Sequence, residues 1–233
     1  MLSRTDVLGV SINQITRQEL LHKLYHQYCN VQKLDTYPTI VSFVNAQSLV
    51  TAKQDILHKI ALSVSDFCIA DGWPIAKLAK TEKISGPDFM LDAARHPQIG
   101  RLRHVLLGGE GVAYKAALTQ FISSPSCDGA PWIPGDGEWF LQHPEQIPEC
   151  DFLWVSLGCP KQERWMMRNR FNVRCSVMLG VGAAFDFLAG EVQRAPVWMQ
   201  RSGLECLHRI YTDPKRWRRQ VGSILGLIRL LIK

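Results

Sequence analysis

Residues 152–163 read FLWVSLGCPKQE, an apolar run that stops at Gly158-Cys159-Pro160 and leads into a helix-like segment over 161–170. A short, near-continuous apolar run that is followed directly by a helix is typical of a strand buried on both faces of a parallel sheet. The same pattern predicts an α/β fold of Rossmann-like type, with a mostly parallel sheet flanked by helices. It recurs in four other apolar runs, at 39–44, 66–70, 104–107 and 176–179.

Small or polar residues follow each of these runs. Asn45 follows the first run, where a single helix is predicted to continue to about Ile60, and Asp71-Gly72 and Gly108-Gly109 follow the second and third. In open parallel sheets, ligands bind outside the carboxyl ends of the strands. We therefore expect Asn45, Asp71, Gly108 and the 158–163 loop to share one cleft at this edge of the sheet.

Asp71-Gly72 has two interpretations. Asp and Gly are common in turns because of local hydrogen bonding and permissive backbone angles. However, a carboxylate beside an apolar strand end also has its pKa raised by burial, and it is then a better proton acceptor. The second interpretation makes Asp71 a candidate general base.

The 158–163 loop opens a helix, whose free N–H groups and partial positive charge suit a phosphate. Lys161 adds a full charge, although Lys161, Gln162 and Glu163 also fit a solvated first turn. Cys159 is not expected to be a nucleophile, because no paired His or Asn is identifiable in the sequence.

Gly109-Glu110-Gly111 follows an apolar run, as a dinucleotide-binding fingerprint does. Tyr114 occupies the sixth position, where that pattern requires Gly or Ala. The match favours a close turn near a ligand more than NAD. It leaves a Rossmann-type oxidoreductase as the alternative function.

A metal site is not predicted. His22 and His26 are four residues apart on a predicted helix, but no third ligand is evident. No aspartate pair of the DxD type is present either. We therefore expect neither metal nor cofactor, and arginines, lysines and helix ends would neutralise the charge of a phosphate-bearing ligand.

The bulk composition is that of a globular protein with a basic balance. The chain has 233 residues, 46% hydrophobic and 21% charged, with a formal net charge of +6. These values favour acidic partners and one sizeable domain. Its seven cysteines form no CxxC pair, and the first residues lack a signal-peptide core, which predicts a cytoplasmic location.

The last forty residues differ in character. From 194 to 233 there are nine Lys or Arg residues and two acids, interleaved with large apolar side chains. We interpret 1–193 as the core and 194–233 as a basic amphipathic helical appendage. This pattern suits an interfacial helix on an anionic membrane better than nucleic acid. A simple core-packing helix pair is the other alternative.

Taken together, several segments resemble the WecG/TagA/CpsF family of bacterial glycosyltransferases. They cover most of the chain in the expected order. The resemblance is carried by residues 44–46, 69–72, 85–89, 106–109, 158–163, 180–186, 194–200, 203–209 and 213–216.

The resemblance implies an inverting, metal-independent enzyme that transfers N-acetylmannosamine or a related sugar from UDP to an undecaprenyl-diphosphate-linked acceptor. It also implies a peripheral location on the inner face of the plasma membrane. Asp71 matches the family's proposed base, and Asn45 and Gln162 match polar residues around the transferred sugar. The resemblance also implies that tail arginines help to complete the site, and Arg209, Arg216 and Arg219 are the matching positions. The full predicted set of substrate- and nucleotide-binding residues is Gly108, Gly109, Lys161, Glu163, Arg194, Arg209, Arg216 and Arg219.

Two positions depart from the family pattern. Phe43 stands where some members have Thr, so one polar contact is missing or replaced. Cys159 stands where Ser or Thr is also common. These departures concern the donor and the acceptor rather than the reaction type. A homo-oligomer is compatible with the sequence.

Overall fold

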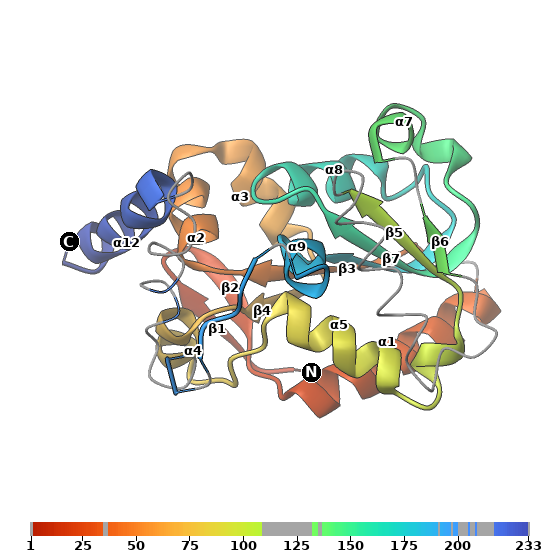
Figure 1. The fold of residues 1–233 in the computed structure, drawn as a ribbon, viewed down its shortest axis with the longest axis horizontal. Coiled ribbons are helices and arrows are strands. Elements are labelled where there is room, and N and C mark those ends of the chain that lie inside the picture. The colour runs from red at the N-terminus through yellow and green to blue at the C-terminus, as the bar shows by residue number, and fades with distance from the viewer. Residues whose placement is uncertain are drawn as a thin grey trace.

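A six-stranded sheet in the order β4-β3-β8-β7-β5-β6 forms the centre of the molecule in a computed structural model (Figure 1). Every neighbouring pair in it is parallel, which confirms the predicted parallel sheet. The structure describes residues 2–34, 37–108, 132–134, 137–190, 192–196, 198–199, 205, 208 and 217–232. The strands of this sheet are β3 (Thr39–Val44), β4 (Phe67–Ala70), β5 (His104–Gly108), β6 (Trp132–Pro134), β7 (Cys150–Ser156) and β8 (Cys175–Gly180).

Helices lie on both faces of this sheet, as predicted (Figure 1). All five predicted strands are present, whereas β6 was not predicted. The helices are α1 (Arg17–Leu34), α2 (Ala46–Gln54), α3 (Ile56–Ser63), α4 (Trp73–Ala79), α5 (Gly86–Arg95), α7 (Gly137–Gln142), α8 (Lys161–Asn169), α9 (Ala184–Leu188) and α12 (Trp217–Ile232), with short 3-10 turns at Ile99–Arg101 and Pro144–Gln146.

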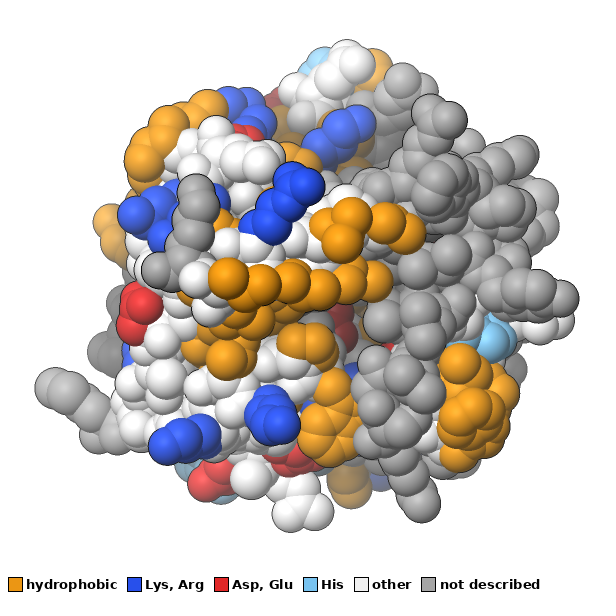
Figure 2. Space-filling view, turned by 90° about the vertical axis from the view of Figure 1, so that its left-hand side faces the viewer, with side chains coloured by type: hydrophobic (Ala, Val, Ile, Leu, Met, Phe, Trp, Pro, Cys, Tyr) orange, Lys and Arg blue, Asp and Glu red, His pale blue; other side chains and the backbone are white. Residues whose placement is uncertain are grey.

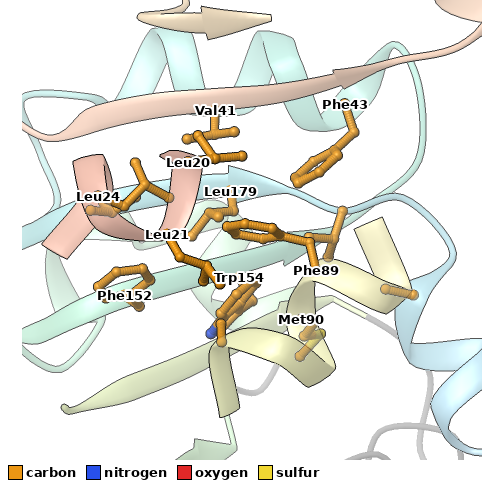
Figure 3. Close-up of a cluster of buried hydrophobic side chains, with 14 of the residues drawn as sticks. Leu20, Leu21, Leu24, Val41, Phe43, Phe89, Met90, Phe152, Trp154 and Leu179 are labelled. Carbon is orange, nitrogen blue, oxygen red and sulfur yellow. The ribbon is translucent and has the colours of Figure 1, made fainter. Parts of the chain in front are cut away.

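One face of the sheet packs against α1, α5 and α9. Alternate strand residues point to this side, as the period of two in a β-strand requires. Phe89 on α5 is fully buried and lies beside Phe43 of β3, with ring centroids 5.6 Å apart. Burying one such side chain contributes roughly 1.5–3 kcal/mol. Figure 3 shows this cluster, including Leu20, Leu21, Leu24, Val41, Phe43, Phe89, Met90, Phe152, Trp154 and Leu179.

The intervening strand residues form a second core on the opposite face. Leu153, Val155 and Met178 pack there against Trp165 and Met166 of α8. The strands are therefore apolar on both faces, which explains why their sequences read as unbroken hydrophobic runs.

A two-stranded antiparallel hairpin precedes the main sheet and was not predicted. It consists of β1 (Arg4–Val7) and β2 (Val10–Asn13). Its apolar side chains share a core with α2, α4 and Leu227 of α12. The hairpin thus covers the β4 edge of the structure, and Asn13 accepts a hydrogen bond from the Cys68 backbone N–H at 2.9 Å.

The segment after β3 contains two helices rather than the single predicted helix that runs to about Ile60. The break is at Asp55, which ends α2 and caps α3. Its extended backbone turns the chain, and its carboxylate accepts hydrogen bonds from the backbone N–H groups of Leu57 and His58 at 3.0 and 3.2 Å. The two helices therefore point in different directions.

The C-terminal helix α12 packs against α2. Leu227 is buried there, and a Cβ atom on Gly226 would lie 2.9 Å from a Val50 methyl group. Four apolar side chains of α12 stay exposed: Leu225, Ile228, Leu231 and Ile232. Figure 2 faces the side where α12 lies in Figure 1 and shows hydrophobic side chains gathered there, with Lys and Arg side chains beside them.

Candidate functional site

The predicted site residues follow strands whose carboxyl ends meet at one edge of the sheet. Val44 pairs with Ala70, Val155 with Gly180, and Gly108 with Ser156. Since all these strands are parallel, the residues that follow them emerge on the same side. Asn45, Asp71, Gly108 and the 158–163 loop therefore lie along this one edge, as the parallel strand order predicts.

Asp71 and Asn45 follow adjacent strands. The Asp71 backbone N–H donates to the Val44 carbonyl oxygen at 2.9 Å, so the pairing of β3 and β4 extends to Asp71. Asn45 caps α2, and its Oδ1 accepts from the Ser48 N–H at 3.1 Å. Both side chains are half-buried. The backbones of Asp71 and Asn45 are thus held at neighbouring positions.

Gln162 is almost fully buried, with 3% exposed, and connects two loops of this edge. Its Nε2 donates to the Gly180 carbonyl oxygen and its Oε1 accepts from the Gly182 N–H, both at 2.9 Å. A second Nε2 hydrogen bond goes to Glu163 Oε1. The side chain therefore holds the start of α8 against the end of β8.

Glu163 points into the protein, toward α3. It is 1% exposed, and its Oε2 lies 3.8 Å from Nδ1 of the fully buried His58. Burial raises the pKa of Glu163 to about 7, against smaller lowering effects of hydrogen bonds from Gln162 and its own backbone. Burial also lowers the pKa of His58, against an opposing hydrogen bond to the Ser48 backbone.

Cys159 completes this group, because its Sγ lies 3.6 Å from His58 Nε2. The sequence analysis identified no histidine partner for Cys159, and His58 is 101 residues away in the chain. Neither spacing nor composition marked His58 as a site residue. Only the turn at Asp55 brings it to this loop.

Lys161 is exposed at the first position of α8. Some donors of this first turn are used within the protein, since the Gln162 N–H donates to the Gly158 carbonyl oxygen at 3.1 Å. The Glu163 carboxylate also accepts from its own backbone N–H. Lys161 therefore supplies the charge of this turn that faces solvent.

Gly108 ends β5 with a φ of +102°, a backbone angle that L side chains rarely adopt. A Cβ atom here would lie 2.7 Å from the Ser156 carbonyl oxygen, so only glycine allows β5 and β7 to approach this closely. Gly109 and Tyr114, and with them the dinucleotide-like pattern, lie outside the described residues.

Arg194 lies against the segment that opens α5. It forms an ion pair with Asp88, and its Nη2 donates to Ser85 Oγ at 3.3 Å. Burial alone would lower the pKa of Arg194, but the Asp88 carboxylate, with smaller effects of Glu205 and Asp71, raises it. Asp71 is thus close enough to act electrostatically on this guanidinium.

The remaining predicted arginines are not placed. Arg209 and Arg216 lie outside the described residues. Arg219 belongs to α12, but its side chain is not among those described. Further along the expected appendage, Glu205 pairs with Lys83 at 3.0 Å. The described parts of 194–233 therefore contact the core in several places.

Comparison with known proteins identifies the family. A family model described as "Glycosyl transferase WecG/TagA/CpsF family" matches residues 5–233, nearly the whole chain. The chain belongs to this family. It is a glycosyltransferase, which confirms the resemblance noted from the sequence motifs.

Curated relatives carry one shared name, N-acetylglucosaminyldiphosphoundecaprenol N-acetyl-beta-D-mannosaminyltransferase. The protein from Bacillus subtilis (strain 168) is 27% identical over 192 residues, covering 78% of this chain and 75% of the relative. The one from Staphylococcus aureus (strain MRSA252) is 24% identical over 224 residues, covering 92% and 87%. The chain therefore spans most of their length.

An open groove of about 470 Å3 lies between α4 of the glycosyltransferase and the start of α1. Trp73, Lys77 and Lys80 line one wall at a spacing that places them on one face of α4. Glu19 and Glu82 line the other wall. α4 begins two residues after Asp71. The wall that Trp73, Lys77 and Lys80 form therefore starts near Asp71 and extends along α4.

No helix in the described part of the glycosyltransferase is long and apolar enough to cross a membrane.

His22 and His26 lie on α1 with ring centroids 4.3 Å apart, so their side chains are on the same side of this helix.

Proposed function

We propose that this glycosyltransferase transfers N-acetylmannosamine or a related sugar from UDP to an undecaprenyl-diphosphate-linked acceptor, in bacterial cell-surface polysaccharide or teichoic acid synthesis. The observation that carries the proposal is the family match over residues 5–233, together with the shared name of the relatives. An acceptor that ends in N-acetylglucosamine follows from that name. The match favours a transferase over the alternative oxidoreductase.

The proposed reaction is a single displacement with inversion at the anomeric carbon. The attacking acceptor hydroxyl loses its proton to the Asp71 carboxylate as the new glycosidic bond forms. The bond from the anomeric carbon to UDP breaks, and UDP leaves with its bonding electron pair. The position of Asp71 at the loop-bearing edge of the sheet supports its role as the base.

Negative charge grows on the leaving diphosphate and requires cations or backbone dipoles nearby. Lys161 supplies an exposed ammonium group at the same edge. Arg194 is fixed by Asp88 in a position where Asp71 affects its charge. With these groups neutralising the diphosphate, the reaction step needs no divalent cation. Arg209, Arg216 and Arg219 are proposed to add to this set.

The groove beside α4 suits the polar part of the acceptor. The indole of Trp73, 43% exposed, offers an apolar face to a sugar ring, and Lys77 and Lys80 offer charge to a diphosphate. We place the acceptor's head group here, with the hydroxyl that reacts directed toward Asp71.

The lipid end of the acceptor lies in the membrane, so the enzyme must work at its surface. The exposed apolar side chains Leu225, Ile228, Leu231 and Ile232 on α12 support docking on the inner face of the plasma membrane. Arg229 is exposed on the same helix and would interact with anionic lipid.

A panel of UDP-sugars tests the proposal, with a lipid-diphosphate-linked N-acetylglucosamine as acceptor and mass analysis of the product. We expect the product mass to increase by one N-acetylhexosamine, with UDP released in equal amount and without added divalent cation. Turnover of NAD or NADP without sugar transfer would overturn the proposal.

A further inference from the structure

Three side chains with metal-binding atoms meet between α3 and α8. They are His58 on α3, Cys159 in the loop before α8, and Glu163 on α8. One ligand atom from each lies within 4.8 Å of the other two. His58 and Glu163 are 0% and 1% exposed, whereas Cys159 is half-buried.

The three groups are closer together than those of a Cys-His-acid relay. In such a relay the imidazole stands between the thiol and the carboxylate, which separates sulfur from oxygen by roughly 7 Å. Here Cys159 Sγ and a Glu163 carboxylate oxygen lie within 4.8 Å of each other. One ring nitrogen of His58, the thiol and the carboxylate are therefore close enough together to bind one ion.

The hydrogen bonding of this cluster is incomplete. Glu163 Oε2 is a buried carboxylate oxygen without a hydrogen-bond partner among the described residues. It lies 3.8 Å from His58 Nδ1, too far for a hydrogen bond. A buried, unsatisfied carboxylate oxygen normally has an explanation, such as a bound water or ion.

We propose that His58, Cys159 and Glu163 bind a single Zn²⁺ or similar thiophilic divalent cation. Imidazole nitrogen, thiolate sulfur and carboxylate oxygen are the atoms that zinc prefers, at roughly 2.0–2.3 Å, so neighbouring ligand atoms stand about 3.5 Å apart. The 3.6 Å between Cys159 Sγ and His58 Nε2 fits this spacing. Cys159 is half-buried, so a water molecule can reach the fourth coordination position of the ion.

Charge balance also favours a divalent cation. A thiolate and a carboxylate together carry two negative charges beside a neutral imidazole. A divalent cation cancels both, which removes the cost of burying the Glu163 charge without a partner.

The surrounding residues hold these ligands in place. Gln162 Nε2 donates to Glu163 Oε1 at 2.9 Å, and second-shell hydrogen bonds of this kind orient ligands in metal sites. Asp55 caps α3 and accepts a hydrogen bond from the His58 backbone N–H. It also forms an ion pair with Arg164 of α8. The two helices that supply His58 and Glu163 are therefore tied together beside the site.

The ion would lie between the 158–163 loop and α3. It would therefore hold this loop in place and take no part in the transfer step. The inference is thus independent of the proposed function. It is tested with the full-length protein and Co²⁺, because a Co²⁺–thiolate bond gives a charge-transfer absorption band. We expect one equivalent to bind with this band, and Zn²⁺ to displace it.

Three variants and one control assign the ligands. Cys159→Ser should abolish the band, while His58→Gln and Glu163→Gln should each weaken Co²⁺ binding at least tenfold. Cys29→Ser, which alters a half-buried thiol on α1, should leave the band and the affinity unchanged.

Circular dichroism and thermal melting establish which variants fold, and His58→Gln and Glu163→Gln still carry the test if Cys159→Ser does not. Absence of Co²⁺ binding to the folded wild-type protein overturns the proposal. Wild-type affinity in both His58→Gln and Glu163→Gln does so as well.

Discussion

The backbone N–H of Asp71 donates a hydrogen bond to the carbonyl oxygen of Val44, 2.9 Å away. This bond continues the pairing of β4 with β3 by one residue and places Asp71 beside Asn45, which caps α2. The backbone position of the candidate base is therefore fixed by strand pairing.

Replacing Asp71 by Asn should remove the base, because an amide does not accept the proton but has nearly the same size and shape as the carboxylate. We expect kcat to fall by roughly 10²- to 10⁴-fold, the usual contribution of one positioned base. The melting temperature and the affinity for UDP should stay close to those of the wild type. Asp92→Asn is the matched control, because Asp92 pairs with Arg17 on the surface at 2.8 Å. A variant Asp71→Asn with wild-type turnover would exclude this residue as the base.

Gln162 was predicted to lie near the transferred sugar, but its amide is engaged with the protein backbone. Gln162→Ala would leave the Gly182 N–H and the Gly180 carbonyl without this partner. We expect a loss of about 1–3 kcal/mol in the free energy of unfolding, measured by urea denaturation. Gln98→Ala, at an exposed position, should change it by less than about 0.5 kcal/mol.

The opposite pattern would contradict the interpretation of Gln162 as a clamp between loops. If stability were unchanged in Gln162→Ala and only kcat fell, the side chain would act directly on the sugar, as the resemblance implies.

The strands of the sheet were predictable because burial on both faces leaves a plain mark in the sequence. Phe152 and Trp154 point to one core and Leu153 and Val155 to the other, so the whole run is apolar. The position of Asp71 at the loop-bearing edge followed from that pattern and from the parallel order of the strands.

Other features left no comparable signal. Asp55 looked like one polar residue within a helix, although it caps a second helix and redirects it. The contact of His58 with Cys159 depends on that turn and on packing across 101 residues. The three-residue strand β6 is too short to show a period.

Lys77 and Lys80 test the proposed position of the acceptor. Replacing both by Ala should raise KM for the lipid-diphosphate acceptor about tenfold, which corresponds to about 1.4 kcal/mol of binding. The KM for the UDP-sugar should not change, because the proposal assigns this groove to the acceptor and not to the donor. Lys59→Ala removes an exposed lysine from α3 and serves as control. An unchanged acceptor KM in the double variant would place the acceptor elsewhere.

The exposed apolar side chains of α12 test membrane docking. Leu225→Glu with Ile228→Glu should reduce sedimentation with anionic phospholipid vesicles, since both side chains are nearly half exposed, at 49% and 45%. Stability should change by no more than about 0.5 kcal/mol for such surface positions. Phe171→Glu, at a side chain 69% exposed beyond α8, should leave vesicle binding intact. Equal sedimentation of the wild type and the α12 variant would rule out docking through this helix.

His104 predicts how stability depends on pH. It is fully buried, accepts a hydrogen bond from Trp154 Nε1 at its Nδ1, and lies with Nε2 2.9 Å from the Ile99 carbonyl oxygen. Burial lowers its pKa to about 3, against the smaller opposing effect of the Ile99 hydrogen bond. The unfolded chain, with an ordinary histidine pKa of about 6.5, therefore binds a proton that the folded protein does not.

Consequently, the stability that His104 contributes is complete above about pH 6.5 and is lost as the pH falls toward 3, at about 1.4 kcal/mol per pH unit. His104→Gln keeps one acceptor and one donor but does not titrate. The measurement is the unfolding free energy of both proteins by urea denaturation between about pH 4 and pH 7. Because carboxylates titrate in both, the difference between the curves isolates His104. The wild type should lose stability faster than His104→Gln as the pH falls, and parallel curves would show that His104 does not remain neutral in the folded protein.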